Sequence, residues 1–67
     1  MVKVKLLEYL KDIDKTMYWL AENSRLSYPT VLHFAKNETR SVRFETLDKI
    51  MKTLEIEDFN KILEYKK

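Results

Sequence analysis

The stretch of residues 16–37 constrains the fold more than any other part of this chain, because it divides into two short helical segments around a tight turn. Thr16 and Ser27 stand where these helices would start, and a hydroxyl there can accept a hydrogen bond from an N–H group of the first turn. The stretch therefore predicts helices at about residues 17–23 and 28–36, with the second helix presented to a partner.

Four small or apolar residues are expected to be buried beneath this second helix: Ala21, Leu26, Val31 and Phe34. A small residue such as Ala21 lets the following helix cross closely, which a bulkier side chain would prevent. Two helices that cross steeply around a turn of three or four residues form a helix-turn-helix, whose second helix enters the major groove of DNA. Double-stranded DNA is thus the partner that this stretch predicts.

The turn at residues 23–26 must reverse the chain without glycine, since the sequence contains none. A helix that ends this abruptly usually needs one residue with a positive φ. Asn23 and Arg25 are the candidates. We expect Arg25 to hold the strained conformation, at a cost of about 1–2 kcal/mol.

Three further segments have the apolar spacing of amphipathic helices. Residues 3–12 begin an apolar stripe made of Val4, Leu6, Leu7, Leu10 and Ile13. Residues 44–54 carry the clearest pattern, formed by Leu47, Ile50, Met51 and Leu54. Residues 58–65 follow Asp58, a candidate N-cap. No segment has the period of a strand, so the predicted fold is all-α: a five-helix bundle in one domain, residues 1–67, with the helix-turn-helix at about 16–36.

Composition excludes several kinds of protein. The chain has no cysteine and one histidine, His33, so we expect no disulfide, no metal site and no other cofactor. No apolar run approaches the ~18 residues of a membrane span, and no signal peptide is evident, so we expect a cytoplasmic protein without a membrane partner. Neither a glycine-rich phosphate loop nor a nucleophile signature is present, so we expect no enzyme.

The mild formal charge of +2 is unevenly distributed along the chain. Residues 24–43 have a balance of +3, and residues 44–65 have a balance of −3. A basic middle with an acidic flank fits a domain that turns one face to phosphates and another to water, although ordinary solvated surface charge gives the same pattern.

A set of residues along most of the chain matches the pattern of one known family: Thr16, Leu20-Ala21-Glu22, Leu26-Ser27-Tyr28, Thr30-Val31, Asn37, the run from Arg43 to Ile50, and Leu54. With these residues the chain resembles the Cro/lambda-repressor-like helix-turn-helix family, often called the xenobiotic-response-element family, and is closest to its small single-domain bacterial members. The resemblance implies a five-helix bundle, operator binding through the third helix, and frequent dimerisation. The chain departs from the family in having Arg25 in place of glycine, Met17 in place of glutamine, and a more apolar third helix.

If the third helix lies in the major groove, the side chains near its start reach base edges. The candidates for base contacts are Tyr28, Pro29, Thr30 and His33. Thr30 and Pro29 could meet a thymine methyl group, and His33 could donate to a guanine acceptor. Tyr28 and His33 could instead be ordinary exposed or half-buried side chains.

Contacts to phosphates raise the affinity for every DNA sequence and make binding salt-dependent. The candidates are Ser27, Lys36, Asn37, Thr39, Arg40 and Arg43. Solvated loop charge is the alternative reading, and it applies more to Arg43 than to Lys36 or Arg40.

The last predicted helix offers more apolar surface than a short terminal helix needs to close a small bundle. We therefore expect a homodimer interface made of Phe59, Ile62, Leu63 and Tyr65, with burial in the core as the alternative. The predicted function is a bacterial or phage-type transcriptional repressor that binds a two-fold operator as a dimer and acts by occupancy. The alternative is a protein-interaction module, as in an antitoxin or antirepressor, that binds a protein through the apolar face around Trp19, Tyr28 and Leu32.

Overall fold

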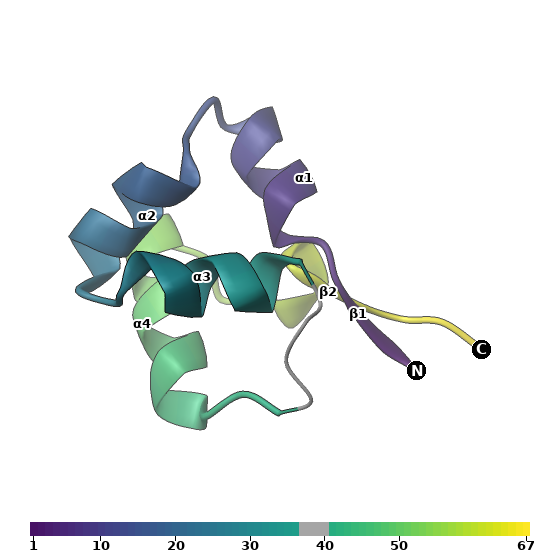
Figure 1. The fold of residues 1–67 in the computed structure, drawn as a ribbon. Coiled ribbons are helices and arrows are strands. Elements are labelled where there is room, and N and C mark those ends of the chain that lie inside the picture. Colours follow the sequence, from purple (N-terminus) through teal and green to yellow (C-terminus); the bar gives the residue numbers. More distant parts are fainter. Residues whose placement is uncertain (37–40) are drawn as a thin grey trace.

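The computed structural model describes residues 1–36 and 41–67, and within them the chain forms four α-helices, one short 3-10 helix and a two-stranded sheet (Figure 1). In chain order the elements are β1 Val2–Val4, α1 Leu6–Asp12, α2 Met17–Ser24, α3 Tyr28–Ala35, α4 Phe44–Leu54, η1 Phe59–Lys61 and β2 Leu63–Tyr65. The domain is therefore mostly helical, and the all-α, five-helix prediction is wrong at the two ends of the chain.

The three central helices follow their predicted bounds to within one residue, because local chemistry determines where they start. Thr16 Oγ1 accepts a hydrogen bond from the N–H of Trp19 at 3.0 Å and so caps α2. Ser27 Oγ accepts one from the N–H of Thr30 at 3.2 Å and caps α3. Pro29 lies in the first turn of α3, where its missing N–H costs nothing.

The buried residues form one hydrophobic cluster to which every α-helix contributes. Its members are Leu6, Leu10, Leu20, Ala21, Val31, Phe34, Ala35, Leu47, Ile50, Leu54 and Ile62. Within this cluster α2 packs against both α3 and α4. Three of the residues expected beneath α3 are buried, whereas Leu26 is only partly buried.

Two strands replace helix at the chain ends. Val2, Lys3 and Val4 pair antiparallel with Tyr65, Glu64 and Leu63 respectively. The ladder extends in both directions, since Lys5 N donates to the carbonyl of Ile62 at 2.8 Å and Lys66 N donates to that of Met1 at 2.8 Å. The first helix therefore begins at Leu6 rather than at residue 3.

This later start changes which residues of the first helix face the core. With the helix beginning at Leu6, the buried pair is Leu6 and Leu10, which are four residues apart and share one face. Leu7 is turned away from them and is 41% exposed, so its predicted place on the apolar stripe is wrong.

The predicted helix at residues 58–65 is also wrong. Asp58 does act as an N-cap, because its Oδ1 accepts a hydrogen bond from the N–H of Asn60 at 2.9 Å. The helix that it starts lasts only three residues, since the chain then extends into β2 and its peptide groups bond to β1. Pairing with β1 satisfies these groups more completely than a short terminal helix would.

Three helices are followed within two residues by a residue with left-handed backbone geometry. Arg25 follows α2 with a φ of 62°, as predicted, and its own N–H bonds to the carbonyl of Ala21. Asp14 and Glu55 follow α1 and α4 with φ values of 59° and 58°, which the sequence did not lead us to expect. In a chain without glycine, residues that carry a Cβ take all three positions.

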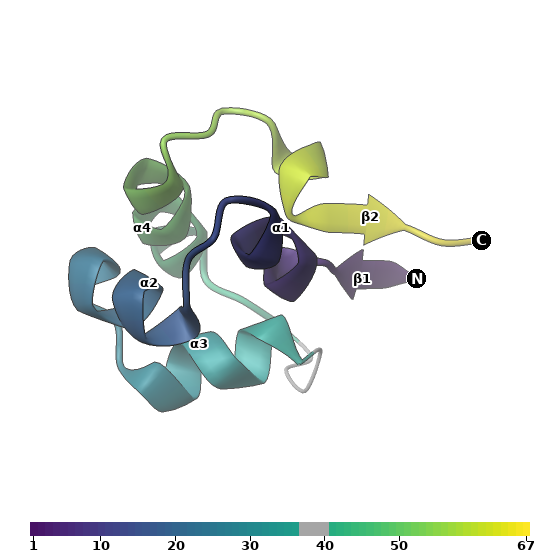
Figure 2. The ribbon, with the colours of Figure 1, turned by 90° about the horizontal axis from the view of Figure 1, so that it is seen from above.

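The arrangement leaves α3 on one side of the molecule. Seen from above in Figure 2, α3 lies along the lower edge, whereas η1 and β2 lie at the upper right. The C-terminal strand therefore does not cover α3. Across residues 1–36 and 41–67, none of the helices has the length and apolar character that crossing a bilayer requires.

Candidate nucleic-acid interface

One face of α3 is fixed to the core, and the residues between the fixed positions point outward. Val31, Phe34 and Ala35 are buried. Pro29, Thr30, His33 and Lys36 are exposed, and Tyr28 and Leu32 are partly buried. The helix contains no acidic residue, so nothing on its outer face repels an anion. Three of the four candidates for base contacts thus lie on an accessible surface of one helix.

The first turn of α3 carries two hydroxyl groups that bond to each other. Ser27 Oγ lies 2.7 Å from Thr30 Oγ1, and Ser27 also accepts the bond from the N–H of Thr30. Only one of the two hydroxyl protons is used in the contact between them. The other proton is available to donate to a phosphate or a base edge, so the pair can cap the helix and still present a donor.

The starts of α2 and α3 are joined by two aromatic rings. Tyr18 and Tyr28 stack with ring centroids 4.3 Å apart and an angle of 15° between the ring planes. Tyr18 is 68% exposed and was not among the predicted site residues. Because these tyrosines occupy the first turns of the two helices, the stack holds both helix starts at one face of the domain.

A second contact belongs to the start of α2. The ammonium group of Lys15 lies over the ring of Trp19, 4.9 Å from its centroid. Lys15 immediately precedes the N-cap Thr16, and it adds a positive charge beside the N–H groups of the first turn of α2. Sequence reasoning missed Lys15, although its place next to a predicted cap was visible.

Arg43 and Thr30 line the same hollow, which lies between α3 and the start of α4. Its volume is about 340 Å³, and its walls are Leu26, Thr30, Phe34, Ser41, Val42, Arg43 and Thr46. Arg43 occupies the N-cap position of α4 without using its side chain to cap that helix, and it is exposed. The structure therefore brings a candidate base contact and a candidate phosphate contact to one concavity.

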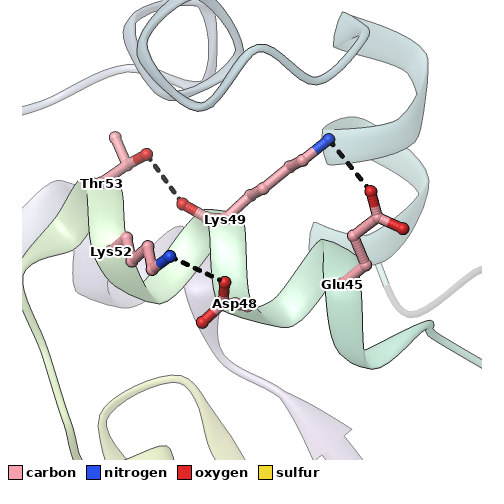
Figure 3. Close-up of polar contacts among 5 residues, drawn as sticks. All are labelled: Glu45, Asp48, Lys49, Lys52 and Thr53. Carbon is pink, nitrogen blue, oxygen red and sulfur yellow. Dashed lines mark hydrogen bonds and ion pairs between the residues drawn. The ribbon is translucent and has the colours of Figure 1, made fainter.

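Beyond Arg43, the carboxylates in the first half of α4 are paired with lysines of the same helix (Figure 3). Lys49 Nζ lies 3.6 Å from Glu45 Oε1, and Lys52 Nζ lies 3.2 Å from Asp48 Oδ2. Exposed pairs of this spacing contribute only about 0.3–0.5 kcal/mol each. Each pair thus places a carboxylate of α4 beside a lysine one turn further along the same helix.

Lys36 follows the last residue of α3 and is exposed. It lines a different hollow from Arg43, together with Lys3 and Lys5 of the N-terminal segment. The remaining candidates for phosphate contacts, Asn37, Thr39 and Arg40, lie outside the described residues.

The four residues predicted to form a dimer interface do not share one environment. Phe59 and Tyr65 are 53% and 71% exposed, and Leu63 is partly buried. Ile62 is fully buried in the core, with 0% exposure, so it cannot contact a second copy. This part of the prediction is wrong, because Ile62 belongs to the turn that joins η1 to β2 and points inward there.

The geometry thus presents two capped helix starts, an outward recognition face and basic groups around it. Comparison with family models adds the deciding observation: residues 5–67 match the Cro/C1-type HTH DNA-binding domain. The chain belongs to this family. The predicted family is therefore confirmed over nearly the whole chain, and with it the lambda-repressor-like helix-turn-helix fold.

Membership of the Cro/C1-type family implies that the domain binds DNA, and the family is typically non-enzymatic. Comparison with curated proteins and with solved structures gives no match. In the described part of the chain, no group of three or more histidine, cysteine, aspartate or glutamate residues could hold a metal ion.

Proposed function

We propose that this Cro/C1-type domain is a sequence-specific transcriptional repressor that inserts α3 into the major groove of an operator and acts by occupancy. The observation that carries the proposal is the outer face of α3, which is exposed, free of acidic residues and not covered by the C-terminal strand (Figure 2). A helix held this way can place its leading side chains against base edges.

Direct base contacts come from the first two turns of α3. Thr30 and Pro29 meet a thymine methyl group in this proposal, and His33, one turn further on, donates to N7 or O6 of guanine. Tyr28 is held by its stack on Tyr18 and is partly buried, so its hydroxyl group rather than its ring face is offered to DNA.

Positioning on the backbone comes from groups that flank this face. Ser27 and Arg43 lie beside the start of α3, and Lys36 follows its end. Backbone N–H groups at the starts of α2 and α3 add donors that suit phosphate oxygens. Asn37, Thr39 and Arg40 remain part of the proposal on sequence grounds alone.

The dimer is proposed to form through β2, with Phe59, Leu63 and Tyr65 at the interface and Ile62 excluded. In the β1–β2 ladder the peptide groups of Ile62 and Lys66 bond to β1, so those of Leu63 and Tyr65 point to the outer edge. No other strand of the described residues occupies that edge. An open edge next to exposed aromatic rings favours pairing with a second copy.

Charge favours one register for that pairing. If the two-fold axis passes through Tyr65, the two copies of Tyr65 face each other across the axis. Glu64 of each copy then lies opposite Lys66 of the other, and opposite charges at such positions stabilise antiparallel strands. A dimer of this kind would match a two-fold operator whose half-sites are about one helical turn apart.

Selection of bound fragments from a random duplex pool tests the function. We expect one preferred operator, with log affinity that falls linearly as log salt rises. His33→Ala should lower the affinity for the selected operator by about 1–3 kcal/mol and leave the affinity for unrelated duplexes unchanged. Arg43→Ala should weaken binding to all duplexes about equally. It should also flatten the salt slope, which is the slope of log affinity against log salt concentration, by about one unit. A pool without a preferred duplex would overturn the proposal.

A protein-interaction role on the same fold is the second candidate, and the exposed Tyr18 ring stacked on Tyr28 is the observation in its favour. This candidate predicts a contact with Trp19, Tyr28 and Leu32 whose affinity changes little with salt. The protein-interaction role would be supported over the repressor if Tyr18→Ala lost partner binding and the selection experiment returned no preferred duplex.

A further inference from the structure

We propose that Lys3, Lys5 and Lys36 form a second binding site for the DNA backbone, at the end of α3 opposite to Ser27. The proposal deepens the proposed function and depends on it, because it assumes that α3 lies against DNA. It assigns a role to the N-terminal strand, which sequence reasoning had placed in the first helix.

The site is a hollow of about 430 Å³ where the N-terminal segment passes the end of α3. Its walls are Lys3, Val4, Lys5, Leu7, Glu8, Ala35 and Lys36. Both ribbon views place β1 beside this end of α3 (Figures 1 and 2). Lys3 belongs to β1, and Lys5 is the N-cap residue of α1, so the hollow lies where the strand passes into the first helix.

Three lysines and one acidic residue, Glu8, line this hollow, and Glu64 lies opposite Lys3 in the sheet, so three positive and two negative charges leave a formal charge of +1 here. The ion pairs found among residues 1–36 and 41–67 both belong to α4, so none of the three lysines is paired there. A concave site with an excess of positive charge attracts an anion. A phosphate group suits it, because its several oxygens can accept from more than one ammonium group.

Lys3 and Lys5 are partly buried, whereas most lysines of the chain are exposed. Their aliphatic stems can lie along the apolar wall that Leu7 and Ala35 provide, with the charged ends in solvent. Part of the side-chain entropy that a phosphate contact costs is therefore lost on folding rather than on binding.

The position of the hollow relative to α3 selects the DNA backbone as its ligand. Lys36 is the residue directly after α3, so the site continues from the recognition helix. A helix of eight residues is about 12 Å long, which is close to the width of the major groove. With the start of α3 at the base edges, its other end lies near the groove wall, where the phosphates are.

The test compares variants in which two charges are removed from different places. The probe is the duplex selected by the wild-type chain, and its affinity is measured over a range of salt concentrations. Lys3→Gln/Lys5→Gln removes both charges and keeps two of the four methylene groups of each side chain. We expect its salt slope to be flatter by about 1.8 units, since each phosphate contact contributes about 0.9. If the plots of log affinity against log salt for the wild type and the variant meet near 1 M salt, this difference in slope equals about 60-fold weaker binding at 0.1 M salt.

Two control variants make the result specific. Lys52→Gln/Lys61→Gln removes the same charge from α4 and η1, and it should leave the salt slope close to that of the wild type. Lys3→Arg/Lys5→Arg keeps the charge and should also keep the slope. Circular dichroism of each variant should match that of the wild type, because the β1–β2 ladder uses the backbone groups of Lys3 and Lys5.

The outcomes separate this inference from the function on which it rests. If the wild type selects an operator and Lys3→Gln/Lys5→Gln keeps the wild-type slope, the second site is overturned and the repressor proposal stands. If the Lys52→Gln/Lys61→Gln control loses as much slope, net charge explains the effect and the site is overturned. If the wild type binds no duplex, both proposals fail.

Discussion

Arg25 sits in a backbone conformation that brings its Cβ close to the following carbonyl oxygen, which costs about 1–2 kcal/mol for a residue other than glycine. Two hydrogen bonds hold it there, since the N–H groups of Arg25 and Leu26 both donate to the carbonyl of Ala21. The strain is therefore built into the element that presents α3.

Arg25→Gly should raise the melting temperature. Glycine removes the Cβ contact and so raises the free energy of unfolding by about 1–2 kcal/mol. The greater freedom of the unfolded chain lowers it by about 0.5–1 kcal/mol. At the middle of these ranges the net gain is about 0.75 kcal/mol, which corresponds to about 3–6 °C for a domain of this size, measured by thermal unfolding followed by circular dichroism.

Arg25→Ala is the matched control, since it removes the guanidinium group and keeps the Cβ. It should not raise the melting temperature. An increase in Arg25→Ala as large as that in Arg25→Gly would show that charge, and not backbone strain, is the cause.

Residues whose effect is local could be predicted from the sequence, and residues whose effect depends on a distant neighbour could not. The caps at Thr16 and Ser27 and the reversal at Arg25 follow from side-chain chemistry within a few positions. The Tyr18–Tyr28 stack does not, because it joins the first turns of two different helices. Its rings meet only after those helices have crossed.

At the scale of elements, the two strands are the part of the fold that could not be predicted from the sequence. Each has three residues, too few to show a period, and its partner lies at the other end of the chain. Val4 and Leu63 also have the spacing of helical stripes with their neighbours. Only the pairing of the two segments decides in favour of strands, and pairing is a property of the folded chain.

Ile62→Ala tests this part of the fold. Ile62 is fully buried where η1 meets β2, so its truncation should lower the free energy of unfolding by about 2–5 kcal/mol. Unfolding in urea measures the change. Leu7→Ala, at a partly exposed position, should cost only about 0.5 kcal/mol. If residues 58–65 instead formed a helix with Ile62 at an intermolecular interface, Ile62→Ala would cost the monomer little.

At the scale of the whole molecule, the recognition face and the apolar groups proposed for dimerisation lie on different sides. The recognition helix is at the lower edge of Figure 2, and β2 is at the upper right. Exposed apolar groups persist near β2, with Val2 at 59% and Tyr65 at 71%, directly opposite each other in the sheet. A second copy can therefore cover β2 without blocking α3.

We expect the chain to sediment as a dimer at micromolar concentration, with Phe59→Ala/Tyr65→Ala shifted to the monomer because the aromatic area beside the strand edge is lost. Tyr18→Ala is the control, since it removes a ring of similar exposure from α2 and should not change the sedimentation coefficient. A wild-type chain that sediments as a monomer at every concentration would remove the dimer from the proposal.

The contact between Lys15 and Trp19 has a practical consequence. The chain contains one tryptophan, and it lies in the first turn of α2 with a cation above its ring. Any anion that draws Lys15 away changes the electric field at the indole and so shifts its fluorescence emission. The domain thus carries its own optical reporter at the edge of the recognition surface, and binding can be followed in solution without attaching a dye.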